Sequence, residues 1–272
     1  MKTSLKTNLR AVFARSYVRF WAANREPSWW ISETIMPLLS TAAYVFVYKA
    51  LKAPEEYIGF VILGGTMSAY WMNVLWSMAA QFYWEKEMGN LELYMIAPIS
   101  RMSILFGMAS GGFIHASTRA VGVFLMGSFL FKVDFAVINL TKLILVFALT
   151  LVALYGLGML FSSVFMLYGR EAWHGANLLQ EPVYLLSGFY FPVRNLGFTV
   201  ALIASFIPLT LGLDAMRQLA FRAGSKFGFI NVNLELSVLV LLCVIFLVAA
   251  NYALKYMEYL GKKEGRLTLR WQ

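Results

Sequence analysis

Long apolar runs separated by short polar segments make up most of the sequence. A helix that crosses a membrane needs about 20 mostly apolar residues. Five runs are long enough, and they cover residues 29–48, 57–84, 102–131, 143–169 and 236–254. Each run predicts one transmembrane helix within its bounds.

The segment between the fourth run and the last is different, because prolines and a charge interrupt it. Residues 172–193 are broken by Glu181 and two prolines, and residues 195–213 are uncharged but contain Pro208. Two complete spans are possible here, and so is one span followed by a hydrophobic hairpin that enters the membrane and turns back. The second arrangement predicts six spans and a re-entrant region over residues 193–217.

Residues 1–25 have the pattern of an amphipathic helix. At 100° per residue their apolar side chains fall within an arc of about 140°, and Arg10, Arg15 and Arg19 lie outside that arc. The apolar face comprises Leu5, Leu9, Val12, Phe13, Tyr17 and Phe20. Such a face with cationic flanks is typical of a helix that lies in the headgroup plane. The alternative is an ordinary juxtamembrane basic segment that only sets the topology.

The composition supports an all-α integral membrane protein. Of the 272 residues, 60% are hydrophobic and only 14% are charged, whereas soluble domains carry about 25% charged residues. The net charge of +9 comes from basic residues in the short flanks between apolar runs, so we expect anionic lipid headgroups as partners rather than nucleic acid. With Cys243 as the single cysteine, a disulfide within one chain is impossible.

The basic residues also predict an orientation. In the six-span arrangement, most of the 23 Lys and Arg residues lie on the side that holds both termini, including the basic tail over residues 255–272. Short loops rich in Lys and Arg stay in the cytoplasm. We therefore expect both termini to be cytoplasmic and the chain to lie in the cell membrane, the plasma or inner membrane.

Motifs for chemistry on this chain are missing from the sequence. It contains no Gly-rich phosphate loop ending in Gly-Lys-Ser/Thr, no H-E-x-x-H and no G-x-S-x-G elbow. His115 and His174 lie in different segments and form no local ligand pair. We therefore predict no catalytic residue, no metal site and no cofactor on this chain.

Four polar side chains interrupt the predicted spans and are candidates for the gate or the pathway: Glu33, His115, Arg119 and Glu181. Ionisable groups at membrane depth are costly, so they need a reason. One hypothesis is that Glu33 and Arg119 pair at helix contacts or line the pathway. The alternative is that Glu33 only touches headgroups and that Arg119 extends to the interface.

The loop over residues 85–98, between the second and third spans, predicts a short helix. Gly89 can break a helix, Asn90 is a good N-cap, and Glu92 in the first turn is favourable. Leu91, Tyr94 and Met95 then share one apolar face, and Pro98 ends the helix. Such a helix can insert into a groove on another protein; the alternative is a solvated turn that connects two spans.

Several blocks of this sequence resemble a known family. Residues 87–92, Glu-Met-Gly-Asn-Leu-Glu, followed by Pro98, are similar to the E-x-G-T-L-E…P signature of ABC type-2 exporter permeases, with Asn90 in place of Thr. Residues 187–192, 207–210 and 214–217 are similar to its S-G-x-x-F-P, N-P-L-T-Y and D-A-x-R blocks, although Ile207 stands where Asn is common. The resemblance extends over essentially the whole chain.

The resemblance implies an architecture and a set of partners. Residues 1–25 would be a gate helix, and residues 26–272 a single six-span domain with a cytoplasmic coupling helix and an external re-entrant pair between spans five and six. Two permease subunits, identical or different, would pair, and each would engage an ATPase subunit that holds ATP and Mg. The coupling residues would be Glu85, Glu87, Gly89, Asn90, Leu91, Glu92, Tyr94, Met95 and Pro98. The re-entrant region would include Gly188, Pro192, Pro208, Asp214 and Arg217.

The sequence therefore predicts an exporter permease for a lipidic, amphipathic or drug-like substrate. In this interpretation the acidic residues of the loop face basic residues of the ATPase, while Leu91, Tyr94 and Met95 fill its groove. A channel or secondary carrier is the alternative, and it would need polar lines through several spans. A membrane-embedded enzyme would need a clustered acid/base or metal set.

Overall fold

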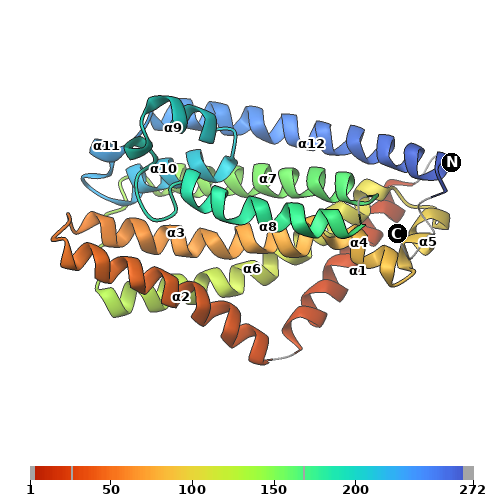
Figure 1. Cartoon of the computed structure of the whole chain (residues 1–272), viewed down its shortest axis with the longest axis horizontal. Coiled ribbons are helices and arrows are strands. Elements are labelled where there is room, and N and C mark those ends of the chain that lie inside the picture. The colour runs from red at the N-terminus through yellow and green to blue at the C-terminus, as the bar shows by residue number, and fades with distance from the viewer. Residues whose placement is uncertain (1–3, 26, 168, 266–272) are drawn as a thin grey trace.

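The computed structural model describes residues 4–25, 27–167 and 169–265, and every regular element in these ranges is helical (Figure 1). The elements are α1 (Leu5–Asn24), α2 (Pro27–Ala50), α3 (Glu56–Met72), η1 (Asn73–Ala79), α4 (Gln81–Glu87), α5 (Asn90–Ile96), α6 (Arg101–Phe131), α7 (Leu140–Phe165), α8 (Gly169–Leu186), η2 (Val193–Leu196), α9 (Phe198–Ala204), α10 (Pro208–Ala220), α11 (Gly224–Phe227) and α12 (Val232–Lys263). The prediction of an all-α protein is confirmed.

Five stretches of the described chain are long and apolar enough to cross a membrane. They are Ile31–Ala50, Glu56–Glu87, Arg101–Phe131, Leu140–Phe165 and Val232–Lys263, which confirms the five apolar runs. The second stretch combines α3, η1 and α4 into one span. A sixth crossing is counted only if the bent pair α9 and α10 is taken as one span. Helix α8, where we predicted the fifth span, is not among the five.

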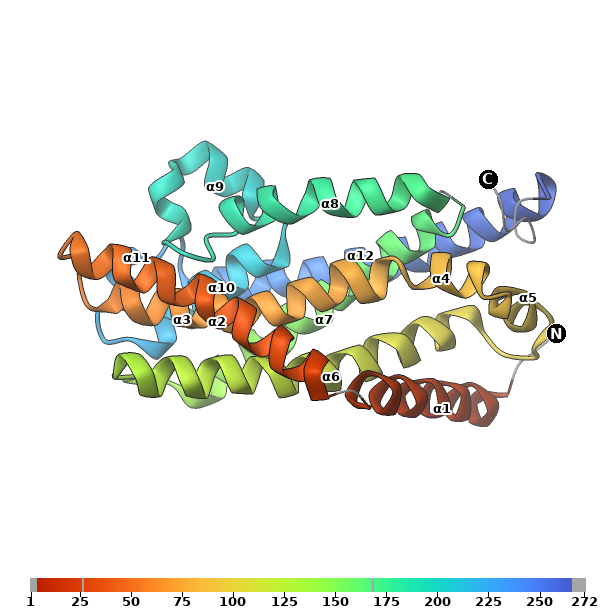
Figure 2. The ribbon, with the colours of Figure 1, turned by 60° about the horizontal axis from the view of Figure 1, so that its bottom comes forward.

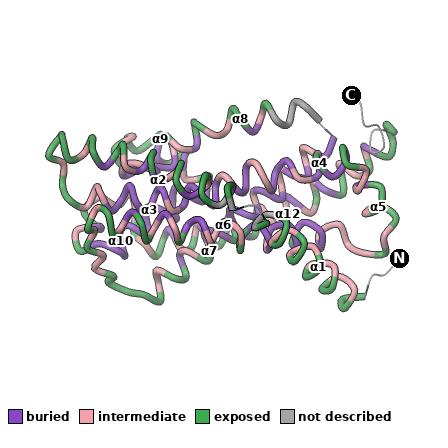
Figure 3. Tube along the Cα trace, turned by 90° about the horizontal axis from the view of Figure 1, so that it is seen from below, coloured by how far each residue is buried: buried purple, intermediate pink, exposed green. Residues whose placement is uncertain are grey.

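The long helices run side by side, with α7 near the centre of the bundle (Figures 1 and 2). Helix α7 packs on α12 and α10, and α6 packs on α3 and α1. Buried residues continue along the whole interior, while many outer positions are exposed (Figure 3). These outer positions include large apolar side chains such as Met36, Phe46, Phe129 and Val244, which fits an exterior covered by lipid rather than water.

The region between α8 and α12 forms a bent helix pair. Helices α9 and α10 meet at 112° across a short break, and every residue of α10 is buried. The chain enters this region from α8 and leaves it into α12 at the same end of the molecule (Figure 1). The bent pair is either a broken span or a re-entrant pair, and the re-entrant arrangement stays a prediction. The opposite end of the molecule carries α5, the start of α1 and the end of α12 (Figure 2).

Helix α1 lies along the first half of α6, and the small residues of α6 allow the close approach. A Cβ atom at Gly107 would lie 2.8 Å from the Val12 carbonyl oxygen, and one at Gly111 would lie 2.9 Å from the Ser16 carbonyl oxygen. The outward face of α1 is apolar and consists of Leu5, Leu9, Phe13, Tyr17 and Trp21. A helix is therefore present over the predicted segment, although Val12 and Phe20 are half-buried rather than on its exposed face.

Candidate functional site

The predicted short helix between the second and third spans is α5. It begins after Gly89, whose positive φ of 77° suits a residue without Cβ. It ends at Ile96 because Ala97 precedes Pro98 and takes the extended conformation that this position favours. The prediction that Asn90 is the N-cap is wrong, because Gly89 occupies that position. Asn90 lies inside the helix, and its side chain points to another partner.

That partner is Glu85, a buried carboxylate that joins three segments of the chain. Its oxygens accept hydrogen bonds from Gln81 Nε2 at 2.7 Å, Asn90 Nδ2 at 3.0 Å and the Tyr94 hydroxyl at 3.1 Å. Arg15 of α1 forms an ion pair with it. Burial raises the pKa of Tyr94, so its hydroxyl stays protonated as a donor. With these four donors the carboxylate is fully satisfied inside the protein.

This position corrects part of the predicted coupling surface. Glu85 is 3% exposed and Leu91 is 1% exposed, so neither faces outward to a partner. Tyr94 and Met95 are half-buried. The side chains that α5 and its flanks expose are Glu87, Met88, Glu92, Leu93, Ile96 and Pro98. The periodicity of α5 was correct, but its apolar face packs on the chain itself.

A polar stripe continues from Glu85 along the second span. Asn73, Ser77, Gln81 and Glu85 follow one another at intervals of four residues, and the first two lie in η1, a π-helical segment. Such segments are frequent at functional sites. The stripe lies between α1 and the bundle core, since the Tyr155 hydroxyl of α7 donates to Asn73 Oδ1 at 3.1 Å.

Two arginines of α1 contact this stripe. Arg15 pairs with Glu85, and Arg19 donates to Gln81 Oε1 at 2.7 Å and also contacts Ser77. Sequence reasoning missed this arrangement because it assigned these arginines to the flank of a surface helix. The sequence did contain a signal for this contact, since both the arginines and their acceptors are spaced four residues apart.

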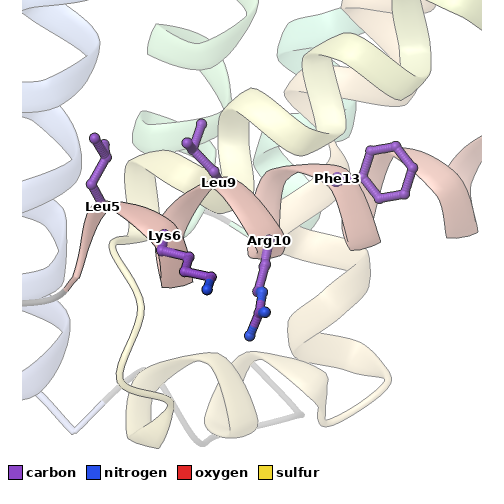
Figure 4. A pocket seen from close by; sticks show the side chains of 5 residues that line it. All are labelled: Leu5, Lys6, Leu9, Arg10 and Phe13. Carbon is purple, nitrogen blue, oxygen red and sulfur yellow. The ribbon is translucent and has the colours of Figure 1, made fainter.

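The outer side of α1 has a different character. A shallow pocket over its first turns is lined by Leu5, Lys6, Leu9, Arg10 and Phe13. Figure 4 shows Lys6 and Arg10 on one side of the helix and Leu5 and Leu9 on the other. Basic and apolar side chains in this order are typical of a helix at a lipid–water interface.

The predicted Glu33–Arg119 pair is present at the contact between α2 and α6. The Arg119 guanidinium binds the Glu33 carboxylate, and His115 Nε2 lies 3.9 Å from the same carboxylate. Arg119 also donates to the His115 carbonyl oxygen at 2.8 Å. Its side chain is only 4% exposed, so the alternative that Arg119 extends to the interface is wrong.

The fourth intramembrane candidate, Glu181, lies apart from this pair on α8. It is exposed and accepts a hydrogen bond from Gln180 Nε2 at 3.1 Å. Gln180 in turn accepts one from Trp76 Nε1 at 2.9 Å. Glu181 is thus connected to η1 through Gln180.

The residues of the re-entrant motifs come together around Arg217. Its guanidinium donates to the carbonyl oxygens of Phe60, Phe189 and Phe191 at 2.9 to 3.1 Å. Gly188 has a positive φ of 67° in the turn after α8. Pro192 precedes η2, and Pro208 is the first residue of α10. Asp214 accepts from the Phe229 amide at 2.8 Å. The motifs at 187–192 and 214–217 therefore form one packed unit.

Within the described ranges, no three His, Cys, Asp or Glu residues are placed to hold a metal ion. The features that stand out are instead helical contacts between α1, the second span and α5. With several apolar spans and an apolar exterior, the chain is a multi-pass membrane protein.

Comparison with known proteins gives the family. The profile of the ABC-2 type transporter family matches residues 7–221. The chain is 24% identical over 233 residues to the Inner membrane transport permease YadH of Escherichia coli K12, which covers 83% of this chain and 84% of YadH. It is 26% identical over 141 residues, 52% of this chain and 38% of the relative, to the "Probable multidrug ABC transporter permease YbhR" of the same strain. The chain belongs to the ABC-2 type transporter family, as a permease subunit.

Proposed function

We propose that this chain forms the translocation path of an ATP-driven exporter and is moved by separate ATPase subunits. Two permease subunits, identical or different, would form the path, and each would engage one ATPase that holds ATP and Mg. The observation that carries the proposal is the buried Glu85 carboxylate, which ties α5 to α1 through Asn90, Tyr94 and Arg15.

Helix α5 is the segment that we propose for the ATPase contact. Its outward side exposes Leu93 and Ile96, which are 59% and 80% exposed, and Met88 at 70% lies beside them. Glu87 and Glu92 are also exposed. Apolar side chains with acidic neighbours suit a groove with a basic rim. The inward side is anchored by Leu91, so α5 is held as a rigid lever.

Motion of α5 would pass to α1 along the polar stripe. When ATP draws the ATPases together, α5 shifts and Glu85 shifts with it, because they share hydrogen bonds. Arg15 and Arg19 then carry α1 along. This is a two-state rearrangement that binding energy on the partner biases, rather than chemistry on this chain.

The placement of α5 supports a proposed orientation. An ABC ATPase would lie in the cytoplasm, so the end of the molecule that carries α5, the start of α1 and the end of α12 would face the cytoplasm. The excess of Lys and Arg on that side supports this topology, and the name of the relative YadH supports the inner membrane. Helix α1 would lie at the cytoplasmic interface with its apolar face in lipid.

For the substrate we propose a lipidic, amphipathic or drug-like compound. The name of the relative YbhR, a probable multidrug ABC transporter permease, supports this class, and the outer loops of this chain are too short to build an external recognition domain. Glu33 and Arg119 are the gate candidates, because a charged pair between α2 and α6 is costly at membrane depth. The exposed Leu178 and Leu185 of α8 support a second permease subunit as neighbour.

The proposal is tested by co-expressing the permease with candidate ABC ATPase subunits from the same genome. We expect Ile96→Arg to reduce the ATPase recovered with the affinity-purified permease about tenfold, because it places a charge in the proposed contact. The matched control is Ile138→Arg, which changes an isoleucine that is 60% exposed in the loop before α7. The control should leave recovery unchanged.

Substrate-stimulated ATP hydrolysis by the reconstituted complex is the second readout. Normal assembly and normal hydrolysis with Ile96→Arg would remove α5 from the mechanism. Transport by the permease alone, without ATP, would favour the channel or secondary carrier instead.

A further inference from the structure

Two buried carboxyl groups meet at the end of the molecule opposite α5. Asp214 of α10 is 2% exposed, and Glu235 in the first turn of α12 is 0% exposed. Gln218 Nε2 lies 2.9 Å from Asp214 Oδ2 and 3.3 Å from Glu235 Oε2. Both carboxyl groups are thus within reach of one nitrogen, and they link the re-entrant pair to the last span.

The available donors do not satisfy both groups as carboxylates. The Gln218 amide has two hydrogens, and it also lies 2.8 Å from the Ile230 carbonyl oxygen. Asp214 has a second donor in the Phe229 amide at 2.8 Å. In contrast, Glu235 Oε1 is buried and receives no hydrogen bond from any donor in the described part of the chain.

The two carboxyl groups are also neighbours. Asp214 Oδ2 and Glu235 Oε2 both lie against the same Gln218 nitrogen. Two ionised carboxylates have no hydrogen to place between them, and like charges in a buried site favour the neutral form of one partner. One proton on the pair resolves both difficulties, since it supplies the missing hydrogen and removes one charge.

The nearest cation does not replace this proton. Arg217 lies on the same helix as Asp214. Its two terminal nitrogens, however, donate to the carbonyl oxygens of Phe60, Phe189 and Phe191. Arg217 therefore donates to neither carboxyl group, and Glu235, whose Oε1 receives no donor, is the group that keeps the proton.

Cations on the neighbouring elements are directed elsewhere. Lys142 of α7 donates to Asn233 Oδ1 at 3.0 Å. Lys226 of α11 is exposed, and its carbonyl oxygen accepts a hydrogen bond from Arg194. Across the ranges that the structure describes, no ion pair joins a cation to either carboxyl group.

We propose that Asp214 and Glu235 form a proton-binding site, with one proton held on Glu235 and shared with Asp214. This proton fastens α10 to the first turn of α12 and so holds the re-entrant pair in place. The site does not depend on the proposed function, because neither residue takes part in the ATPase contact.

The proton gives the stability of the protein a defined pH dependence. The folded chain holds a proton that the unfolded chain releases above the ordinary range of a Glu side chain. Stability therefore falls as pH rises, by about tenfold in the folded-to-unfolded ratio per pH unit for this one proton. The dependence ends at the pH where the folded protein also loses the proton.

The experiment compares the purified full chain in detergent with Glu235→Gln, whose amide keeps a hydrogen on Asp214 without titrating. Thermal stability is measured between about pH 6 and about pH 8. We expect the folded-to-unfolded ratio of the unsubstituted chain to fall about tenfold more per pH unit than the same ratio of Glu235→Gln. The control Glu55→Gln, an exposed carboxyl group in the loop before α3, should behave like the unsubstituted chain. Equal slopes for all three proteins would overturn the proposal.

Infrared spectroscopy gives a second readout that does not require the variant to be stable. The unsubstituted chain at neutral pH should show the C=O band of a buried carboxylic acid, and Glu55→Gln should keep it. Absence of that band would refute the site. Replacing the sodium of the buffer by a large organic cation tests whether the two carboxyl groups bind a metal ion instead of a proton. Stability that follows sodium rather than pH would also overturn the proposal.

Discussion

Glu85 and Arg119 show how single charged residues become tolerable in this protein. Each is almost fully buried, and each has an opposite charge on another helix, Arg15 for the first and Glu33 for the second. Burying one charge alone is much more costly than burying a pair with additional hydrogen bonds. The charges therefore mark the contacts α1–α4 and α2–α6, where two helices must keep a defined register.

For these single charged residues, we predict that Glu85→Gln destabilises the protein. The substitution keeps the shape of the side chain but leaves Arg15 without its counter-charge, which costs about 3 kcal/mol for a buried pair. The melting temperature of the purified chain should fall by about 5 to 10 °C. Glu87→Gln, two residues away and exposed, is the control and should leave the melting temperature unchanged. An unaltered melting temperature for Glu85→Gln would show that the pair contributes nothing.

Helix α1 has the reverse arrangement of a helix on a soluble protein. Arg15, Arg19 and Ser16 face the bundle, while Leu5, Leu9 and Phe13 face outward. Polar contacts to the second span and close packing on the glycines of α6 hold it in place. Exposed apolar groups suit contact with lipid, so we propose that α1 is bound to the bundle and also lies in the membrane surface.

A disulfide between α1 and α6 tests whether this contact must change during transport. Ser16 Oγ and Ser110 Oγ are 2.5 Å apart, so Ser16→Cys with Ser110→Cys should form a disulfide under mild oxidation. Under the proposed function we expect the oxidised protein to lose nearly all transport and to regain it with a reductant. The single variant Ser16→Cys is the control. Full transport with the disulfide intact would show that α1 moves together with α6.

The whole molecule has two different ends. One end carries α5 and the first turns of α1, and the other carries the packed unit of α9, α10 and the motif residues around Arg217 (Figures 1 and 2). The bundle between them has an apolar exterior. Under the proposed function, one end would contact the ATPase and the other would release the substrate.

Labelling from the two sides of the membrane tests this orientation. Glu87→Cys and Glu55→Cys place thiols at exposed positions at opposite ends of the second span. A membrane-impermeant maleimide should label the first only in inside-out vesicles and the second only in right-side-out vesicles. The thiol of Cys243 is buried, so background labelling should be low. The reverse pattern would place α5 outside the cell and exclude the proposed ATPase contact.

Local sequence patterns were sufficient for much of the fold and for part of the candidate site. The five spans, the short helix α5 and its end before Pro98 depend on apolar length, periodicity and backbone preferences, which act within one segment. The Glu33–Arg119 pair was also within reach, because isolated charges in apolar runs need partners. The N-cap assignment of Asn90 failed because Gly89, with its positive φ, takes the cap position, and the Asn90 side chain instead donates to Glu85.

The sequence by itself determined that this chain is a helical membrane protein of the ABC-2 type, since length, apolarity and short motifs are properties of contiguous residues. Only the tertiary structure decided which faces turn inward: that α1 points Arg15 and Arg19 at the second span, that Leu91 is core, and that Asp214 and Glu235 come together at Gln218. A periodic pattern defines the faces of a helix but not their neighbours. Those neighbours come from segments far apart in the chain, and packing alone selects them.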